Sequence, residues 1–187
     1  MQGQSSKDKF RLLRAQAGLL VVDIQERLCA AMDPSALERM IRRTSAAIQG
    51  ARALGLPIAV TEQYPKGLGR TVPALTALLP DIRPIEKLNF SCALPEVLSA
   101  LNRDQILIAG MEAHVCVFQT VRDLSERQLV PYILADAVLS RTEEDRQVGL
   151  SLCQAVGAVV TSVECALFDL LGKAGSPEFK VVSQAVK

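Results

Sequence analysis

Short apolar runs alternate with longer stretches of helical periodicity along this chain from Gly18 onward. The runs hold almost no polar residue, which is typical of strands covered on both faces of a sheet. Strands that alternate with helices predict βαβ units around a parallel sheet. We therefore expect six strands, at residues 19–22, 58–60, 84–85, 106–109, 131–134 and 158–161.

The stretches between these runs predict four helices. Asp33 and Pro34 supply an N-cap and a proline at the first helical position, and the apolar spacing after them ends at Gly55. The other three helices are expected to begin near Cys116 and to cover residues 143–155 and 163–171. Residues 65–84 contain Pro and Gly, and we expect them to form a pocket-lining loop with a short helix.

Right-handed crossovers between such strands give a three-layer α/β/α sandwich with a doubly wound six-stranded parallel sheet, a Rossmann-like arrangement. The chain has 187 residues, enough for one domain. We expect a flexible N-terminal extension over residues 1–17 and a single domain over residues 18–187. Ligands of doubly wound sheets bind beyond the carboxyl ends of the strands, so the chemistry is expected there.

Charge and cysteine content narrow the range of functions. There are 21 basic and 20 acidic residues, a net charge of +1, which gives no electrostatic footprint for nucleic acid or for a membrane surface. The five cysteines include no CxxC pair, which argues against a disulfide framework and a zinc site.

The polar N-terminus lacks the apolar core of a secretory signal. We expect a cytoplasmic protein, with a mitochondrial location left open.

Three residues with reactive side chains follow predicted strands. Asp23, Lys87 and Cys116 each lie just beyond a carboxyl end, so they are expected to converge at one edge of the sheet. A cysteine at the first turn of a helix, near a lysine, is expected to have a lowered pKa. An aspartate beside it can accept the thiol proton and return it to a leaving group. Taken singly, Asp23 is equally consistent with a turn cap.

Motifs around these residues resemble those of the isochorismatase-like cysteine hydrolase superfamily. They are Val22-Asp23-Ile24-Gln25, Glu86-Lys87 after a short strand, and the run of residues 110–117, Gly-Met-Glu-Ala-His-Val-Cys-Val. The run of residues 61–69, Thr-Glu-Gln-Tyr-Pro-Lys-Gly-Leu-Gly, is similar to the branch of isochorismatase domain-containing proteins. The resemblance covers residues 18–171, and three motifs in the same order make it specific.

The resemblance implies roles for individual residues. Cys116 attacks a carbonyl carbon, Asp23 carries the proton, and Lys87 holds the pair together. The backbone N–H groups of Glu112 and Cys116 form the oxyanion hole, and the peptide bond between Met111 and Glu112 is cis. Residues expected to line the substrate pocket are Gln25, Glu62, Gln63, Phe90, Ser91 and His114, although core packing and turn capping explain Phe90 and Ser91 equally well.

The sequence also departs from two activities of the superfamily. Nicotinamidases carry an Asp and several His for a metal near the second strand, but here that place reads Glu62-Gln63-Tyr64 and His114 is the single histidine. We therefore expect no metal and no other cofactor. True isochorismate hydrolases typically lack the cysteine, so Cys116 argues against vinyl-ether cleavage.

The sequence predicts a cysteine-dependent hydrolase that cleaves a small-molecule amide or related C–N bond through a thioester. A non-catalytic binding or scaffold protein, a vinyl-ether hydrolase and a redox thiol protein are the alternatives. The expected partner is a small-molecule substrate, not nucleic acid or a membrane. The resemblance also suggests a homo-oligomer, and the apolar residues Phe179, Val181 and Val182 are expected to be exposed for an interface.

Overall fold

Parallel strands form the centre of the computed structural model, which describes residues 8–187. The sheet has six strands in the order β3-β2-β1-β4-β5-β6, and every pair is parallel. The predicted doubly wound sheet is confirmed, with each strand where an apolar run was seen. Their bounds are β1 Ala17–Val22, β2 Ile58–Gln63, β3 Ile85–Lys87, β4 Gln105–Met111, β5 Val130–Leu139 and β6 Val159–Thr161.

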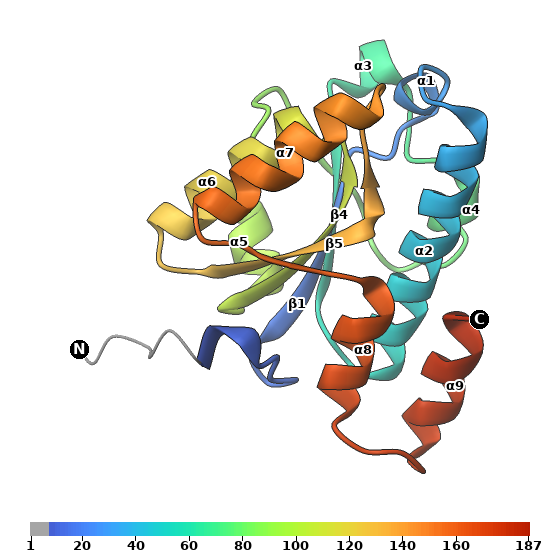
Figure 1. Cartoon of the computed structure of the whole chain (residues 1–187). Coiled ribbons are helices and arrows are strands. Elements are labelled where there is room, and N and C mark those ends of the chain that lie inside the picture. Colours follow the sequence, from blue (N-terminus) through green and yellow to red (C-terminus); the bar gives the residue numbers. More distant parts are fainter. Residues whose placement is uncertain (1–7) are drawn as a thin grey trace.

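Helices cover both faces of this sheet and complete the predicted three layers (Figure 1). One face carries α2, α8 and α9, and the other carries α5, α6 and α7. The helices are η1 Asp8–Phe10, α1 Glu26–Cys29, α2 Pro34–Ala53, α3 Pro65–Leu68, α4 Pro73–Thr76, α5 Pro95–Leu101, the π-helix η2 Ala113–Val117, α6 Phe118–Glu126, α7 Glu143–Ala155, α8 Val163–Leu171 and α9 Pro177–Ala185.

Capping residues fix most of the predicted helix ends. The carboxylate of Asp33 accepts the N–H of Ala36 at 2.8 Å, and α2 begins at Pro34 as predicted. Thr142 caps α7 in the same way, through the N–H of Asp145. Helix α8 ends at Gly172, which has the positive φ of 66° that favours glycine. The predicted helices near Cys116 and over residues 143–155 and 163–171 are therefore present.

The central strands approach each other closely at their carboxyl ends. Val22 of β1 pairs with Thr61 of β2 and with Gly110 of β4. A Cβ atom on Gly110, which has φ of 128°, would lie 2.0 Å from the carbonyl oxygen of Val22. Only glycine fits this position, and it lets the loop after β4 lie directly beside the loop after β1.

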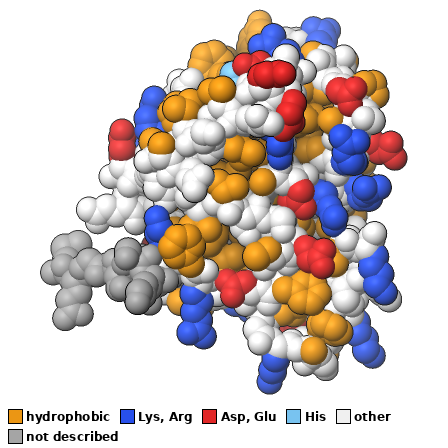
Figure 2. All heavy atoms as spheres, viewed as in Figure 1, with side chains coloured by type: hydrophobic (Ala, Val, Ile, Leu, Met, Phe, Trp, Pro, Cys, Tyr) orange, Lys and Arg blue, Asp and Glu red, His pale blue; other side chains and the backbone are white. Residues whose placement is uncertain are grey.

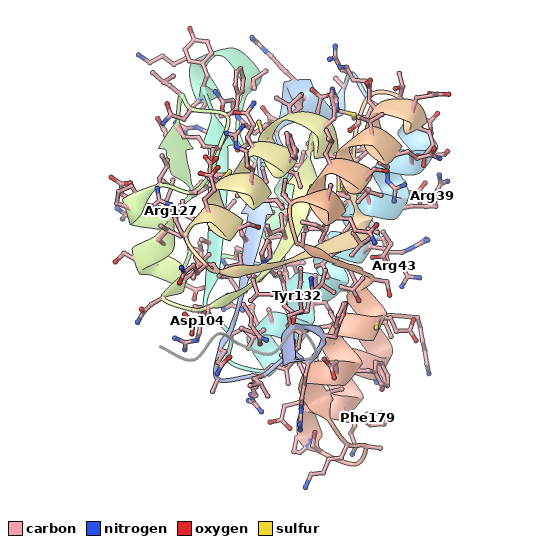
Figure 3. The ribbon with its side chains drawn as sticks, turned by 60° about the vertical axis from the view of Figure 1, so that its left-hand side comes forward. Arg39, Arg43, Asp104, Arg127, Tyr132 and Phe179 are labelled. Carbon is pink, nitrogen blue, oxygen red and sulfur yellow. The ribbon has the colours of Figure 1, made fainter. Side chains whose placement is uncertain are left out.

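The prediction of a flexible extension over residues 1–17 is wrong for residues 8–16. Leu12 is buried in the core, and its N–H donates to the carboxylate of Asp169 at 2.7 Å. The hydroxyl of Tyr132, near the start of β5, donates to the carbonyl of Lys9 (Figure 3). A buried apolar side chain and two polar contacts therefore hold this segment against the rest of the fold. The remainder of the predicted extension, residues 1–7, lies outside the described residues.

The C-terminal residues also differ from the prediction. Residues 177–185 form α9, which packs against α2. The side chain of Ser176 caps the start of this helix by accepting the N–H of Phe179. Val182 is fully buried there, so it offers no surface to a second copy. The ring of Phe179 packs edge-on against Phe168 with 6.1 Å between centroids (Figure 3). Val181 is exposed, as predicted.

The surface carries charges of both signs. On the face drawn in Figure 2, basic and acidic side chains are interspersed, as the near-zero net charge would suggest. Among residues 8–187, no helix has the length and the apolar character needed to cross a bilayer.

Candidate active site

The three residues predicted to converge do so at the carboxyl edge of the sheet. Asp23 directly follows β1, Lys87 is the last residue of β3, and Cys116 lies in η2 after β4. Asp23 has a φ of 49°, in the left-handed region that aspartate tolerates better than most residues. Lys87 begins two strands away from β1 and spans that distance with its long side chain. All three are buried.

The ammonium group of Lys87 is surrounded by oxygen acceptors. Its Nζ lies 2.7 Å from Oδ2 of Asp23 and 2.7 Å from Oε1 of Gln63. The carbonyl oxygens of Asn89 and Phe90 lie at 3.1 and 3.0 Å. Burial alone would lower the pKa of Lys87, but the neighbouring Cys92, Asp23 and Cys116 raise it above its ordinary value. Lys87 therefore carries a fixed positive charge inside the site.

The carboxylate of Asp23 is held on both oxygens. Oδ2 accepts from Lys87, and Oδ1 accepts from the hydroxyl of Thr61 at 2.7 Å. Asp23 and Thr61 are both fully buried, so no solvent competes for these hydrogen bonds. The carboxylate is thus oriented from two sides toward the loop that carries Cys116.

The expected lowering of the Cys116 pKa is wrong for the resting site. Burial, and after it the adjacent carboxylate of Asp23, raises the pKa of this thiol well above its ordinary value, although Lys87 acts in the opposite direction. Cys116 also lies in the π-helix η2, before α6 begins at Phe118. The thiol of Cys116 is therefore protonated at neutral pH in the resting site.

The predicted pocket residues on β2 and in the loop after β1 make internal hydrogen bonds. The amide of Gln25 donates to the carbonyls of Gln63 and Gly69, at 3.0 and 2.7 Å, and accepts the N–H of Gln63 at 2.7 Å. Glu62 accepts from the N–H and hydroxyl of Thr71 and from Arg70. Burial opposes ionisation of Glu62, but these hydrogen bonds hold its pKa below its ordinary value. Of these three predicted residues, Gln63 contacts Lys87.

The other predicted pocket residues lie on the loops around the site. Phe90 contributes its carbonyl to Lys87, while its side chain is exposed. The hydroxyl of Ser91 accepts the N–H of Ala93 at 3.2 Å, a local turn contact. Nδ1 of His114 lies 3.0 Å from the hydroxyl of Ser140. A pocket role for these side chains stays a prediction.

The loop that carries the thiol is fixed by its neighbours. The Met111–Glu112 peptide bond is cis. The carboxylate of Glu112 pairs with Arg141 at 3.0 Å, and its carbonyl accepts the N–H groups of Val115 and Val117. A Cβ atom on Gly149 of α7 would lie 2.6 Å from the backbone between Ala113 and His114. The backbone of helix α7 therefore packs directly against the backbone of this loop.

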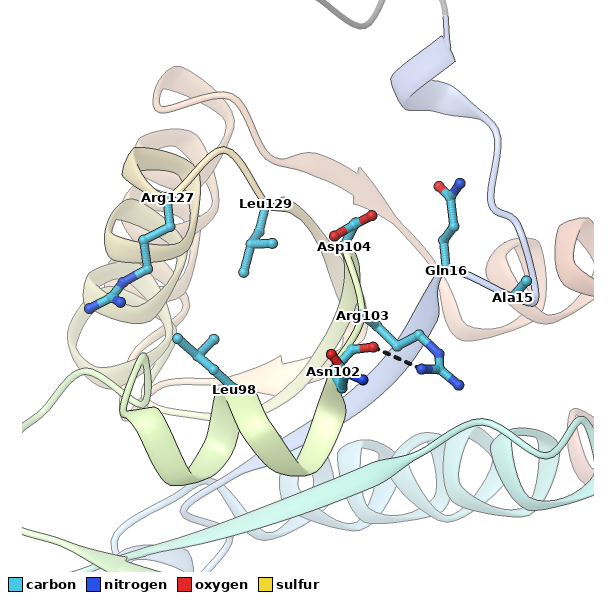
Figure 4. Close-up of a pocket in the computed structure, with 8 residues that line it drawn as sticks. All are labelled: Ala15, Gln16, Leu98, Asn102, Arg103, Asp104, Arg127 and Leu129. Atoms are coloured by element: carbon cyan, nitrogen blue, oxygen red, sulfur yellow. Dashed lines mark hydrogen bonds between the residues drawn. The ribbon is translucent and has the colours of Figure 1, made fainter. Parts of the chain in front are cut away.

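A small groove of about 340 Å³ borders the site and is partly apolar; it is lined by Tyr64, Pro65, Lys66, Glu86, Lys87 and Leu88. A larger hollow of about 530 Å³ lies at the opposite edge of the sheet, where Gln16, Asp104 and Leu129 precede β1, β4 and β5 (Figure 4). None of the predicted site residues lines that hollow. The groove is therefore the recess that adjoins the predicted chemistry.

Sequence reasoning missed three buried residues of the site. Thr61 bonds Asp23, and Cys92 lies 3.4 Å from the hydroxyl of Thr61. Thr120 on α6 accepts the N–H of Cys92 and donates to the carbonyl of Cys116. The one sequence signal is the threonine that directly follows the apolar run of residues 58–60.

Comparison with known proteins now identifies the family of this chain. The isochorismatase domain model matches residues 17–165. The chain belongs to the isochorismatase family. It is 36% identical to a secreted isochorismatase effector of Phytophthora sojae, over 98% of this chain and 90% of the relative. It is 35% identical to isochorismatase domain-containing protein 2 of Bos taurus, over 95% and 86%.

A solved structure described as the MAR1 ribonuclease of Caenorhabditis elegans is also similar to this isochorismatase-family chain. It has a TM-score of 0.89 and 35% identity over 94% of this chain and 92% of that one. The predicted membership of the superfamily, and of its branch of isochorismatase domain-containing proteins, is confirmed. Within residues 8–187, no group of three His, Cys, Asp or Glu side chains is placed to hold a metal ion.

Proposed function

We propose that this isochorismatase-family protein is a cysteine-dependent hydrolase of a small-molecule amide or related C–N bond. The observation that carries the proposal is the buried ion pair of Lys87 and Asp23 beside the thiol of Cys116. A buried ion pair is rarely the most stable arrangement of its residues, and such groups are common where charge is needed for chemistry. Cys116, Asp23 and Lys87 are the proposed catalytic residues.

The first half of the reaction forms a thioester. Asp23 takes the proton of the Cys116 thiol, and the thiolate forms a bond to the carbonyl carbon of the substrate. The carbonyl π electrons move to oxygen, where the N–H groups of Glu112 and Cys116 stabilise the negative charge. The charge then returns to the carbonyl as the C–N bond breaks, and Asp23 gives its proton to the leaving nitrogen.

The second half releases the acid. Asp23 accepts a proton from water as the water oxygen attacks the thioester carbon. The C–S bond then breaks, and Asp23 returns the proton to the sulfur of Cys116. Lys87 stays charged throughout, and its positive charge balances the one negative charge that passes from the carboxylate of Asp23 to the sulfur of Cys116. The groove beside Lys87 is proposed to hold the apolar part of the substrate.

Three other functions remain to be separated from this one by experiment. A binding or scaffold protein would keep the fold without turnover, and a vinyl-ether hydrolase would act on a C–O bond. The Caenorhabditis elegans structure is described as a ribonuclease. The net charge of +1 gives no overall attraction for a phosphate backbone, and this favours a small uncharged or weakly charged substrate.

The test is a panel of small amides, ureides and nicotinamide, assayed for release of ammonia or acid, with Cys116→Ala as the control. Release by the wild type that Cys116→Ala lacks is the expected result. A vinyl ether and a single-stranded RNA belong in the same panel. Cleavage of either one by Cys116→Ala at the wild-type rate would contradict the proposed reaction. Mass spectrometry of the intact protein during turnover should also show an acyl group on Cys116.

A further inference from the structure

Thr61 lies where two buried polar groups of the site meet. Its Oγ1 lies 2.7 Å from Oδ1 of Asp23 and 3.4 Å from Sγ of Cys92. An ionised carboxylate accepts hydrogen bonds and donates none, so the single hydroxyl hydrogen of Thr61 goes to Asp23. The thiol of Cys92 must then be the donor to Thr61. The donors follow the order Cys92, Thr61, Asp23.

The backbone of Cys92 extends this chain of hydrogen bonds to the nucleophile. Its N–H donates to Oγ1 of Thr120 at 2.8 Å, and the hydroxyl of Thr120 donates to the carbonyl of Cys116 at 2.6 Å. Thr61, Cys92 and Thr120 come from β2, the loop after β3, and α6. They connect the side chain of Asp23 with the backbone of Cys116.

Complete burial makes the direction of these hydrogen bonds matter. Thr61, Cys92, Thr120 and Asp23 each have 0% exposed area, so water cannot replace a missing donor. Burial, and after it the charge of Asp23, raises the pKa of Cys92 to about 11, which keeps its thiol protonated and able to donate at neutral pH. Packing alone would be satisfied by a valine at residue 61. Packing therefore does not explain why residue 61 carries a hydroxyl group that donates to Asp23.

We propose that Thr61, oriented by Cys92, is a positioning residue that holds the carboxylate of Asp23 in place for proton exchange with Cys116. This inference rests on the proposed function, because it assumes that Asp23 takes the thiol proton. The hydroxyl of Thr61 holds Oδ1 of Asp23 while Lys87 holds Oδ2, so the carboxylate keeps one orientation. Without the hydroxyl, the carboxylate would be held on one oxygen and would meet the thiol less often in the geometry that proton transfer needs.

Besides Thr61, three groups face Asp23. They are Lys87 from β3, Cys92 from the loop after β3, and Cys116 from η2. Lys87 stays positive and both thiols stay neutral at neutral pH, because all three pKa values are raised. The reactivity of Cys116 therefore depends on how well Asp23 is placed to take the thiol proton.

The experiment measures the rate at which iodoacetamide alkylates Cys116 at neutral pH, by mass spectrometry of its peptide. Thr61→Val should slow this alkylation by about tenfold, because the carboxylate that takes the thiol proton is no longer held on both oxygens. Thr61→Ser keeps the hydroxyl and should restore the wild-type rate, and Cys92→Ala should give a smaller loss. Cys153→Ala, which removes a buried thiol on α7, is the control and should leave the rate unchanged.

A folded Thr61→Val protein that is alkylated at the wild-type rate would overturn the inference. If Thr61→Val does not fold, the smaller Thr61→Ala variant decides between the same two outcomes. Asp23→Asn distinguishes this failure from failure of the proposed function. Alkylation of Asp23→Asn at the wild-type rate would mean that Asp23 is not the base, and the proposed function would fail first.

Discussion

The Nζ atom of Lys87 lies 2.7 Å from Oδ2 of Asp23, and neither side chain has any exposed area. Two opposite charges are therefore kept together without solvent. Removal of one partner leaves the other charged and buried, which costs far more than the net stability of the pair. The stability of the fold and the chemistry of the site are coupled through this contact.

Lys87→Met should abolish turnover and lower the free energy of unfolding by about 3–5 kcal/mol, because Asp23 would be buried without a counter-charge. The double variant Asp23→Asn/Lys87→Met should recover most of this stability and none of the activity. Urea denaturation and the amide assay measure the two effects separately. A single variant as stable as the wild type would contradict the buried ion pair.

Glu62→Gln should lower the free energy of unfolding at neutral pH by about 1.5–3 kcal/mol, the range for hydrogen bonds to a charged group. The pKa of Glu62 is lower in the folded protein than its ordinary value of 4.5, so its contribution is present above pH 4.5. That contribution disappears as the pH falls through the lowered pKa. The stability difference between variant and wild type should therefore shrink on acidification, as followed by urea denaturation at several pH values. Glu86→Gln, which changes an exposed partner of Arg70, is the matched control and should cost less than about 1 kcal/mol.

Gly149→Ala should reduce activity by about 10²-fold, because its Cβ atom would displace the backbone that carries the nucleophile, and small misplacements of reacting groups are expensive. The accompanying loss of stability should be about 1–3 kcal/mol. Ser151→Ala, at an exposed position of the same helix, is the control for both measurements. Equal activity in the two variants would mean that α7 does not set the position of the loop.

Leu12→Ala should destabilise the protein by about 2–5 kcal/mol, the cost of truncating a buried leucine. Leu13→Ala, at the neighbouring exposed position, should change the free energy of unfolding by about 0.5 kcal/mol or less. Thermal or urea denaturation of both variants decides the question. Similar stability of the two would mean that residues 8–16 do not belong to the cooperative fold.

Dialysis against EDTA should leave the rate of amide hydrolysis unchanged. Glu62 accepts hydrogen bonds from Arg70 and Thr71, and Nδ1 of His114 lies beside Ser140. Among residues 8–187, neither side chain belongs to a group of three His, Cys, Asp or Glu residues placed to hold a metal ion. Lys87 already supplies positive charge at the site. A rate that falls on dialysis and returns with zinc or manganese would contradict this prediction.

Most of the fold could be predicted because burial on both faces leaves an apolar signature in each strand. The strand ends were less visible, since Glu62 and Gln63 are polar residues inside β2. The carboxylate of Glu62 accepts from Arg70 and Thr71, and the amide oxygen of Gln63 accepts from Lys87. Lys87 is distant in sequence, and Arg70 and Thr71 lie on a loop of no regular pattern. Sequence periodicity cannot anticipate such partners.

The site could be predicted in its members but not in its electrostatics. Asp23, Lys87 and Cys116 could be found from their motifs and from the strand ends that they follow. The raised pKa of Cys116 depends on how deeply the thiol is buried and on its nearness to Asp23, which are properties of the packed structure. Thr61 is uncharged and belongs to no catalytic motif, so its role is visible only from its contacts with Oδ1 of Asp23 and Sγ of Cys92.

The pairing of β1 with β4 brings together residues that are far apart in the chain. Leu19 lies opposite Leu107, so residues 23–104 must be looped out before Asp23 and Cys116 can meet. Closing so long a loop is a slow and entropically costly event in folding. During refolding, the recovery of Asp23-dependent reactivity at Cys116 would therefore mark the time at which strands β3-β2-β1 join strands β4-β5-β6.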